Sequence, residues 1–195
     1  MVNIEKIIGL LAGILIGSAQ LIYLFNTCKK VVTPSVLSWF GWACLMGTSL
    51  VSQILGKGWQ WSQMSILCST AGCVAIATTA LLSNNYSWNR RDLRFLFIGL
   101  ACVIIYLLSD NAWITTIFAV IADAALGIPT LQKAYTDPAS ERSPAWLLGV
   151  ISSTLALIIC IGHDAIYTLF PGYLFLFNGA MVYLTRRVST ASMKC

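Results

Sequence analysis

The feature that most constrains this chain is a series of apolar segments that carry almost no charge. A helix needs about 20 apolar residues to cross the hydrocarbon core of a bilayer, with a range of about 17–25. Asp123 is the only charged residue that lies well inside one of these segments. The segments predict seven crossings: Ile7–Thr27, Ser35–Gly56, Ser62–Ser83, Leu93–Ser109, Asn111–Gln132, Pro144–Gly162 and Ala165–Thr185.

The composition supports a lipid environment. Hydrophobic residues make up 58% of the 195 residues and charged residues 10%, against about 45–50% and about 25% in an ordinary globular domain. A protein surrounded by water needs more charge than this to cover its surface. We therefore expect an all-α membrane protein, with the lipid bilayer as a partner, no nucleic-acid partner and one transmembrane domain over residues 1–195.

The loop charges predict an orientation. With seven crossings, only Lys6 and Lys57 fall on the side of the N-terminus, and the other ten Lys and Arg residues fall on the side of the C-terminus. Cytoplasmic loops are enriched in Lys and Arg. We therefore expect the N-terminus outside and the C-terminus in the cytoplasm. Because Val188–Cys195 carries no lysosomal sorting motif, a bacterial inner membrane is the expected location.

Two segments of the chain resemble each other. The stretch "GSAQLIYLFNTCKKVVTP", Gly17–Pro34, and the stretch "GIPTLQKAYTDPASERSP", Gly127–Pro144, lie 110 residues apart and align without a gap. Glycine allows helices to approach closely, and proline is favoured in the first turn of a helix. Thr33 and Ser143, which precede the two prolines, are potential N-caps.

This repeat predicts the architecture. Two parallel three-helix repeats, over about residues 4–84 and 111–187, would be joined by a linker helix over about residues 93–109. Because three crossings is an odd number, the linker helix restores the orientation of the second repeat. This 3+1+3 plan is one used by transporters, which place their substrate site near the midplane between the repeats.

At this point the chain resembles the PQ-loop group of seven-helix membrane proteins. That group includes the SWEET sugar transporters, the cystinosin-type lysosomal exporters and the KDEL receptor, and it is named for a Pro-Gln pair in helices one and five. Here Ala19-Gln20 and Pro129-Thr130 occupy those positions, so each repeat keeps half of the pair. The resemblance implies alternating access to a central site.

Asp123 is the strongest candidate for a functional residue. A carboxylate inside the bilayer costs about 2.5–3.5 kcal/mol on insertion scales, and such residues are usually functional. The cystinosin-type proteins carry an Asp four residues before a Gly of helix five, as Asp123 and Gly127 do here. This resemblance implies proton coupling or substrate binding. The alternative is a structural pair with Gln20, Asn178 or a threonine.

Three more residues are candidates for the lining of a solute pocket. SWEET-type proteins place an Asn of helix seven in the sugar pocket, and Asn178 lies there, although the matching position of the first repeat is Cys68. Gln20 can bind substrate or hold helices together by hydrogen bonds. Trp39 can stack on a solute or face lipid.

Glycines and prolines supply the candidate hinges. Proline inside a helix removes a hydrogen bond and kinks the helix, so Pro129 predicts either a static kink or a hinge for alternating access. Gly127 adjoins it. The other candidate hinge residues are Gly17, which matches Gly127 in the repeat, and the matched pair Pro34 and Pro144.

The loop from Lys133 to Arg142 holds four charged residues. It can form a gate of ion pairs at the cytoplasmic end, or it can be a solvated loop whose exposed pairs contribute little. The sequence leaves both interpretations open.

The function expected from these observations is a small-solute carrier. The solute would be a sugar, an amino acid or a similar small polar metabolite, with protons as a candidate coupling ion. The alternative is a membrane receptor of the KDEL-receptor type, which would need more charged groups in its cavity. No enzyme motif, metal site or cofactor is expected, and a chain this short is compatible with a homo-oligomer.

Overall fold

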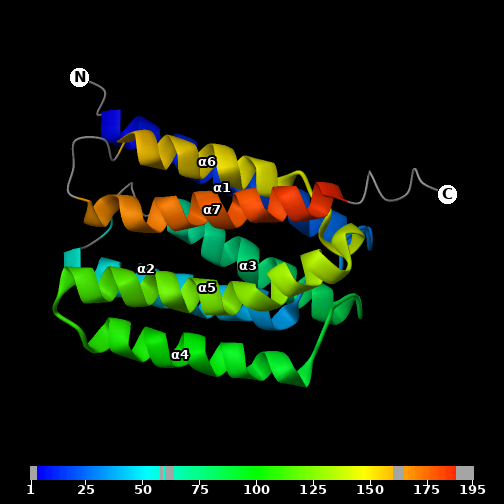
Figure 1. Cartoon of the computed structure of the whole chain (residues 1–195). Coiled ribbons are helices and arrows are strands. Elements are labelled where there is room, and N and C mark those ends of the chain that lie inside the picture. The colour runs from blue at the N-terminus through cyan, green and yellow to red at the C-terminus, as the bar shows by residue number, and fades with distance from the viewer. Residues whose placement is uncertain (1–3, 58, 60–63, 160–164, 188–195) are drawn as a thin grey trace.

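The computed structural model describes residues 4–57, 59, 64–159 and 165–187. The described chain is all-helical, as the sequence predicts, with seven α-helices and two short 3₁₀ helices (Figure 1). The side chains of Lys6, Lys57 and Arg91, and the whole of Lys194, lie outside the described residues. The elements are α1 (Ile4–Cys28), α2 (Val36–Lys57), α3 (Met64–Leu82), η2 (Arg90–Asp92), α4 (Leu93–Leu108), α5 (Ala112–Thr136), η3 (Pro138–Glu141), α6 (Ala145–Ile159) and α7 (Ile166–Arg186).

The helix ends follow from local sequence. α5 begins after Asn111, whose side-chain oxygen accepts hydrogen bonds from the backbone N–H groups of Trp113 and Ile114, as an N-cap does. α1 and α3 are both followed by a left-handed residue, Lys30 with φ 56° and Asn84 with φ 49°. A left-handed residue is the usual way to end a helix.

The two Thr/Ser-Pro pairs lie at helix starts but cap differently. Each proline lies within two residues of the start of α2 or α6. Ser143 Oγ accepts a hydrogen bond from the N–H of Ala145 at 3.2 Å, as predicted. The prediction is wrong for Thr33, whose hydroxyl lies 3.4 Å from Asn85 Oδ1 instead. The Thr33 hydroxyl therefore contacts the loop after α3.

The helices pack in the same order in the two halves of the chain. α3 contacts both α1 and α2, and α7 contacts both α5 and α6. The two sets of three meet where α1 contacts α6 and α2 contacts α5, while α4 lies along α5 and α2 at the margin of the bundle (Figure 1). One cluster of buried hydrophobic side chains draws on all seven helices.

Four helices, α1, α3, α5 and α7, are long and apolar enough to cross a membrane. α2, α4 and α6 contain shorter apolar stretches, at residues 36–51, 93–105 and 145–158. Helices of this length and apolarity are typical of membrane-spanning segments. They agree with the apolar composition of the chain.

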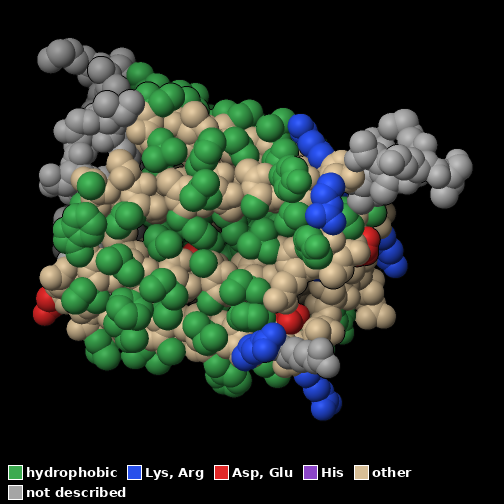
Figure 2. Space-filling model, in the orientation of Figure 1, with side chains coloured by type: hydrophobic (Ala, Val, Ile, Leu, Met, Phe, Trp, Pro, Cys, Tyr) green, Lys and Arg blue, Asp and Glu red, His purple; other side chains and the backbone are tan. Residues whose placement is uncertain are grey.

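The outer surface is apolar along the helices. Large hydrophobic side chains are exposed on several of them, including Leu21 at 66%, Leu55 at 83% and Leu82 at 84%. Monomeric soluble proteins rarely expose large continuous apolar patches. In the face drawn in Figure 2, hydrophobic side chains cover the helices, and Lys and Arg side chains gather toward the end where α7 finishes.

At this charged end, loops distant in sequence are joined by hydrogen bonds. The side-chain amide of Asn85, in the loop after α3, donates to the carbonyls of Thr27 and Val32 at 3.0 and 2.9 Å. The N–H of Thr33 donates to the carbonyl of Ser140 at 2.7 Å. The loop between α1 and α2 is therefore held both to the loop after α3 and to η3.

Candidate functional site

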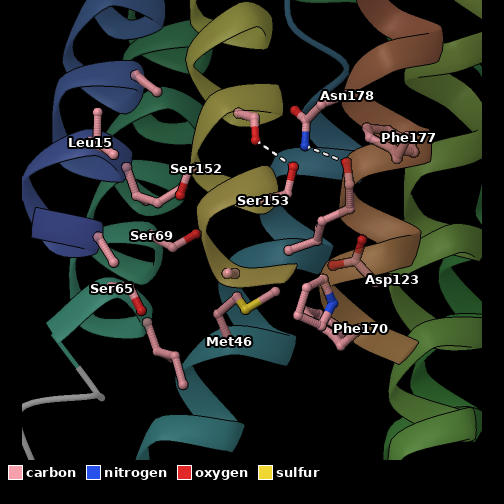
Figure 3. Close-up of a pocket in the computed structure, with 18 of the residues that line it drawn as sticks. Leu15, Met46, Ser65, Ser69, Asp123, Ser152, Ser153, Phe170, Phe177 and Asn178 are labelled. Atoms are coloured by element: carbon pink, nitrogen blue, oxygen red, sulfur yellow. Dashed lines mark hydrogen bonds between the residues drawn. The ribbon is translucent and has the colours of Figure 1, made fainter. Parts of the chain in front are cut away.

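A cavity of about 840 Å³ lies inside the bundle (Figure 3). Its walls come from α1, α2, α3, α5, α6 and α7, so it is shared between the two sets of three helices. It reaches from Ile8, Ser65 and Ile158, near one end of the bundle, to Tyr23 and Trp146 near the charged end. Its size falls in the range of about 300–1,000 Å³ that is usual for ligand pockets.

Asp123 lines this cavity from the middle of α5 (Figure 3). Its side chain is 3% exposed, and the hydroxyl of Tyr173 on α7 donates to its Oδ2 at 2.6 Å. The partner is therefore Tyr173 and not the Gln20, Asn178 or threonine considered from the sequence. The carboxylate is enclosed by the bundle and does not point at the lipid-facing surface.

Five aromatic side chains form the floor of the cavity, and we call them the aromatic floor. Neighbouring ring centroids are 4.5 to 6.2 Å apart around a closed circuit, within the usual range for aromatic pairs. Each residue is less than 10% exposed. The floor consists of Tyr23, Trp39, Trp42, Phe177 and Trp146, in the order of the circuit.

Beneath the floor is a buried ion pair. Lys133 Nζ lies 2.6 Å from Oε1 of Glu141, and the Glu141 side chain is fully buried. The hydroxyl of Tyr23 donates to the other carboxylate oxygen, and Trp146 Nε1 donates to the Glu141 carbonyl at 3.0 Å. We call Tyr23, Lys133 and Glu141 the latch. Of the four charged residues in the 133–142 loop, Lys133 and Glu141 form this buried pair, whereas Asp137 and Arg142 are exposed.

The electrostatics of the latch depend on burial. Removal from water raises the pKa of the Glu141 carboxyl, while the Lys133 ammonium and the Tyr23 hydroxyl lower it and Asp137 raises it slightly. Burial has the largest effect, as expected for a carboxylate that has lost its hydration.

Gln20 and Asn178 both line the cavity, and each rests against a glycine of a neighbouring helix. Gln20 packs on Gly72 of α3, where an added Cβ would come within 2.5 Å of the Gln20 side chain. Its amide nitrogen lies 3.8 Å from Cys73 Sγ, and its buried Oε1 has no hydrogen-bond partner among the described residues. Asn178 packs on Gly149 and donates to the Leu174 carbonyl of its own helix at 2.7 Å.

The candidate hinge residues lie in different surroundings. Gly127 faces the aromatic floor, since an added Cβ there would come within 2.5 Å of Phe177 and 3.2 Å of Trp42. At Gly17 the nearest atoms would belong to Cys68, at an ordinary 3.9 Å. Pro129 lies inside α5, two residues beyond Gly127.

The prolines at the helix starts differ as well. Pro34 is buried, and its carbonyl accepts a hydrogen bond from the N–H of Ser87 at 2.9 Å. Pro144 is exposed, and its carbonyl accepts the first backbone bonds of α6 from Leu147 and Leu148. Pro34 is thus fixed to a neighbouring loop, whereas Pro144 is not.

Sequence reasoning missed several residues of the site. Tyr173, Tyr23 and Phe177 resemble ordinary apolar helix positions in the sequence. Only the tertiary structure shows that Tyr173 meets Asp123 and Tyr23 meets Glu141, and that Phe177 belongs to the aromatic floor. Glu141 was one charge among several in a polar loop. The signal that could have found it is the Pro138 start of a short helix, which folds the loop back on the bundle.

In the described part of the chain, no group of three or more His, Cys, Asp or Glu side chains is placed to hold a metal ion. Among the described residues, none that lines the cavity is a Lys, Arg or His. The arrangement can therefore bind a solute through one carboxylate, aromatic faces, hydroxyls and two amides.

The chain matched no family model, no curated protein and no solved structure.

Proposed function

We propose that this protein is a membrane carrier for small organic solutes that works by alternating access. The observation that carries the proposal is a cavity shared by two sets of three helices and blocked at one end by the aromatic floor and the latch. A carrier needs a solute site of this kind, with a closure that can be broken and remade at each end.

The packing order supports a 3+1+3 plan with seven crossings, as in the PQ-loop group that the sequence resembles. In both sets the third helix lies between the first two, and α4 stays at the margin. The shorter apolar stretches of α2, α4 and α6 would cross together with the four long helices. Shorter helices can be accommodated by local thinning of the bilayer.

The closed end is proposed to face the cytoplasm. Lys29, Lys30, Arg142 and Arg186 all lie in loops or helix ends near the latch, and positive charge collects on the cytoplasmic side. The cavity would then open toward the outside, where α1 begins. A bacterial inner membrane remains the proposed location.

Opening the closed end would require separation of the two sets of helices. The contacts there join one set to the other: Tyr23 to Glu141, Asn26 Nδ2 to Ser143 Oγ at 3.1 Å, and the N–H of Thr33 to the Ser140 carbonyl. Pro129 and Gly127, which precede Lys133 by four and six residues on α5, would let that helix bend as the contacts break. Asp123 would bind the solute or a coupled proton during this change.

The test is labelling of a cavity cysteine from each side of the membrane. Ser69 lines the cavity, so Ser69→Cys, in a chain whose seven native cysteines are replaced by alanine, reports access to the site. Asp110→Cys and Lys30→Cys, in exposed loops at the two ends, provide references that a membrane-impermeant maleimide always reaches from its own side.

We expect Ser69→Cys to be labelled mainly from the Asp110 side. Adding Lys133→Met and Glu141→Gln, which removes the ion pair, is expected to raise labelling from the Lys30 side and to lower it from the Asp110 side. Labelling from one side only in every variant would contradict a carrier and favour a receptor. Simultaneous access from both sides would indicate a channel.

A further inference from the structure

The walls of the cavity restrict the chemistry of the solute, and this inference rests on the proposed carrier function. We propose that the cavity binds small organic cations: a protonated amine or quaternary ammonium group on an apolar or aromatic body, without a negative charge of its own.

The charge in the cavity has one sign. Asp123 is the only charged side chain among the described residues that line it, and it is 3% exposed. Among the described residues, the side chain that hydrogen-bonds to it is the neutral Tyr173. A buried carboxylate without a cation is costly, so a positively charged solute would complete the site. An anion, or the carboxylate of a zwitterionic amino acid, would find no positive partner there.

The aromatic floor suits a cation with an apolar surface. Aromatic faces attract a cation placed within about 6 Å of the ring centroid, and Trp is the strongest of them. Trp39, Trp42 and Trp146 all line the cavity. Asp123 lies at the edge of this floor. Trp42 Nε1 donates to the Asp123 carbonyl at 3.3 Å, and the ring centroid of Tyr173 lies 6.0 Å from that of Phe177. One solute can therefore contact both the carboxylate and the rings.

The polar groups of the cavity fit a sugar less well. Ser153 Oγ donates to the Gly149 carbonyl of its own helix at 2.8 Å, and the Asn178 amide donates to the Leu174 carbonyl (Figure 3). The Gln20 amide is directed at Cys73. A polyol needs many donors and acceptors at once, because each of its unpaired hydroxyls loses hydration without compensation.

The experiment compares four solutes that carry a trimethylammonium head or its neutral tert-butyl counterpart. Choline and benzyltrimethylammonium are cations, 3,3-dimethyl-1-butanol is the neutral isostere of choline, and glycine betaine is its zwitterionic relative. Binding to the purified full chain in detergent is measured by titration calorimetry, with sucrose as a fifth probe. We expect the cations to bind at least about ten-fold more tightly than the isostere, the zwitterion and sucrose, a difference of about 1.4 kcal/mol.

Two variants assign the effect to the site. Asp123→Asn is expected to weaken cation binding about ten-fold or more and to leave the isostere unchanged, whereas Asp110→Asn, at an exposed acid outside the cavity, changes neither. Trp39→Phe keeps an aromatic ring of weaker cation affinity. It is expected to weaken cation binding a few-fold even if Asp123→Asn fails to fold.

Equal affinity for choline and its isostere, tighter binding of betaine or sucrose, or no binding of either cation would overturn the proposal. These outcomes are separate from those of the carrier test, which needs no solute. A protein that binds sucrose and still exposes Ser69→Cys alternately to the two sides would be a carrier of another solute class. A protein that binds cations but exposes Ser69→Cys to one side only would support the cation site and contradict the carrier function.

Discussion

The two sets of three helices share a packing order and differ in where they place charge. Tyr23 of α1 and Lys133 of α5 are 110 positions apart, so they match in the sequence repeat, and both reach the same carboxylate, Glu141. The position that matches Glu141 is Val31, which is 53% exposed. Asp123 likewise matches an uncharged residue, Gly13.

In the proposed carrier, this difference would let the contact between the two sets of helices act as a closure. Two identical sets would present the same group to each other at the centre, and like charges would repel. Here one set contributes a neutral hydroxyl and the other contributes both charges, so that a single buried carboxylate is satisfied from both sides. The second set also carries the acid of the cavity. Helix packing is thus shared between the sets, while the charged chemistry belongs to one of them.

The strongest test of this asymmetry is to remove Lys133, the charged member of the matched pair. Lys133→Met leaves Glu141 buried without its cation, and loss of one partner of a buried ion pair costs about 3–5 kcal/mol. Chemical unfolding in detergent measures the loss. Lys30→Met, in the first set and exposed, serves as the control and is expected to change stability by less than about 0.5 kcal/mol.

The double variant Lys133→Met with Glu141→Gln separates pairing from packing. It is expected to be more stable than Lys133→Met alone, because no unpaired charge remains. Equal losses in the two variants would mean that the carboxylate left behind by Lys133→Met carries no cost as an unpaired charge.

Removing the neutral member of the pair is expected to have a smaller effect. Tyr23→Phe keeps the ring of the aromatic floor and deletes only the hydroxyl that donates to Glu141. A hydrogen bond to a charged group contributes about 1.5–3 kcal/mol, so this variant should lose roughly that much in the same unfolding assay. A loss of stability as large as that of Lys133→Met would show that Tyr23 and Lys133 contribute equally to the latch.

The repeated glycines test whether the sets pack alike in detail. Gly127→Ala must displace Phe177 or Trp42 from the floor, and such overpacking usually costs about 1–3 kcal/mol. Gly17→Ala meets only ordinary contacts and is expected to be neutral or slightly stabilising, since alanine is a better helix former than glycine. The melting temperatures of the two variants in one detergent compare them directly. Similar losses in both would contradict the asymmetric packing.

The smallest expected effect is a pH dependence of the closed end. Burial raises the pKa of Glu141 in the closed protein, so the closed form binds a proton more tightly than a form with Glu141 in water. Closure is therefore favoured as the pH falls, and this added stability is lost as the pH rises from the ordinary Glu value through the raised pKa. Lys133, Tyr23 and Asp137 are the charged or titratable groups that act on this carboxyl.

The measurement is the rate of Ser69→Cys labelling from the Lys30 side over a pH series. We expect the rate, corrected for maleimide chemistry with Lys30→Cys, to fall toward acid pH. In Glu141→Gln the dependence should flatten. A rate that rises toward acid pH would show that the ion pair with Lys133 outweighs burial.

Much of the fold could be predicted from the sequence, because helices in an apolar environment are specified by local composition. Apolar runs located the seven helices to within a few residues, and Pro34 and Pro144 marked the starts of α2 and α6. Asp123 could be singled out as a candidate because a charge in an apolar run is conspicuous without any structure. The structure places it in the cavity wall.

The rest of the site depends on which helices meet. Tyr173 and Asp123 are 50 residues apart, and Tyr23 and Glu141 are 118 apart. No local pattern specifies such partners. Glu141 illustrates the difficulty. Its loop sequence is equally compatible with a solvated turn, and only the position of η3 in the structure places the carboxylate beneath the floor.

The sequence alone determined that the chain is helical, that four of its helices are long and apolar enough for a membrane, and that one of these four carries an acid. These properties follow from side chains within a few turns of each other. Only the tertiary structure decided that five aromatic rings close one end of a cavity and that Lys133 and Tyr23 share one buried carboxylate. The reason is that burial and pairing arise between helices, where positions far apart in the chain determine the cost of each charge.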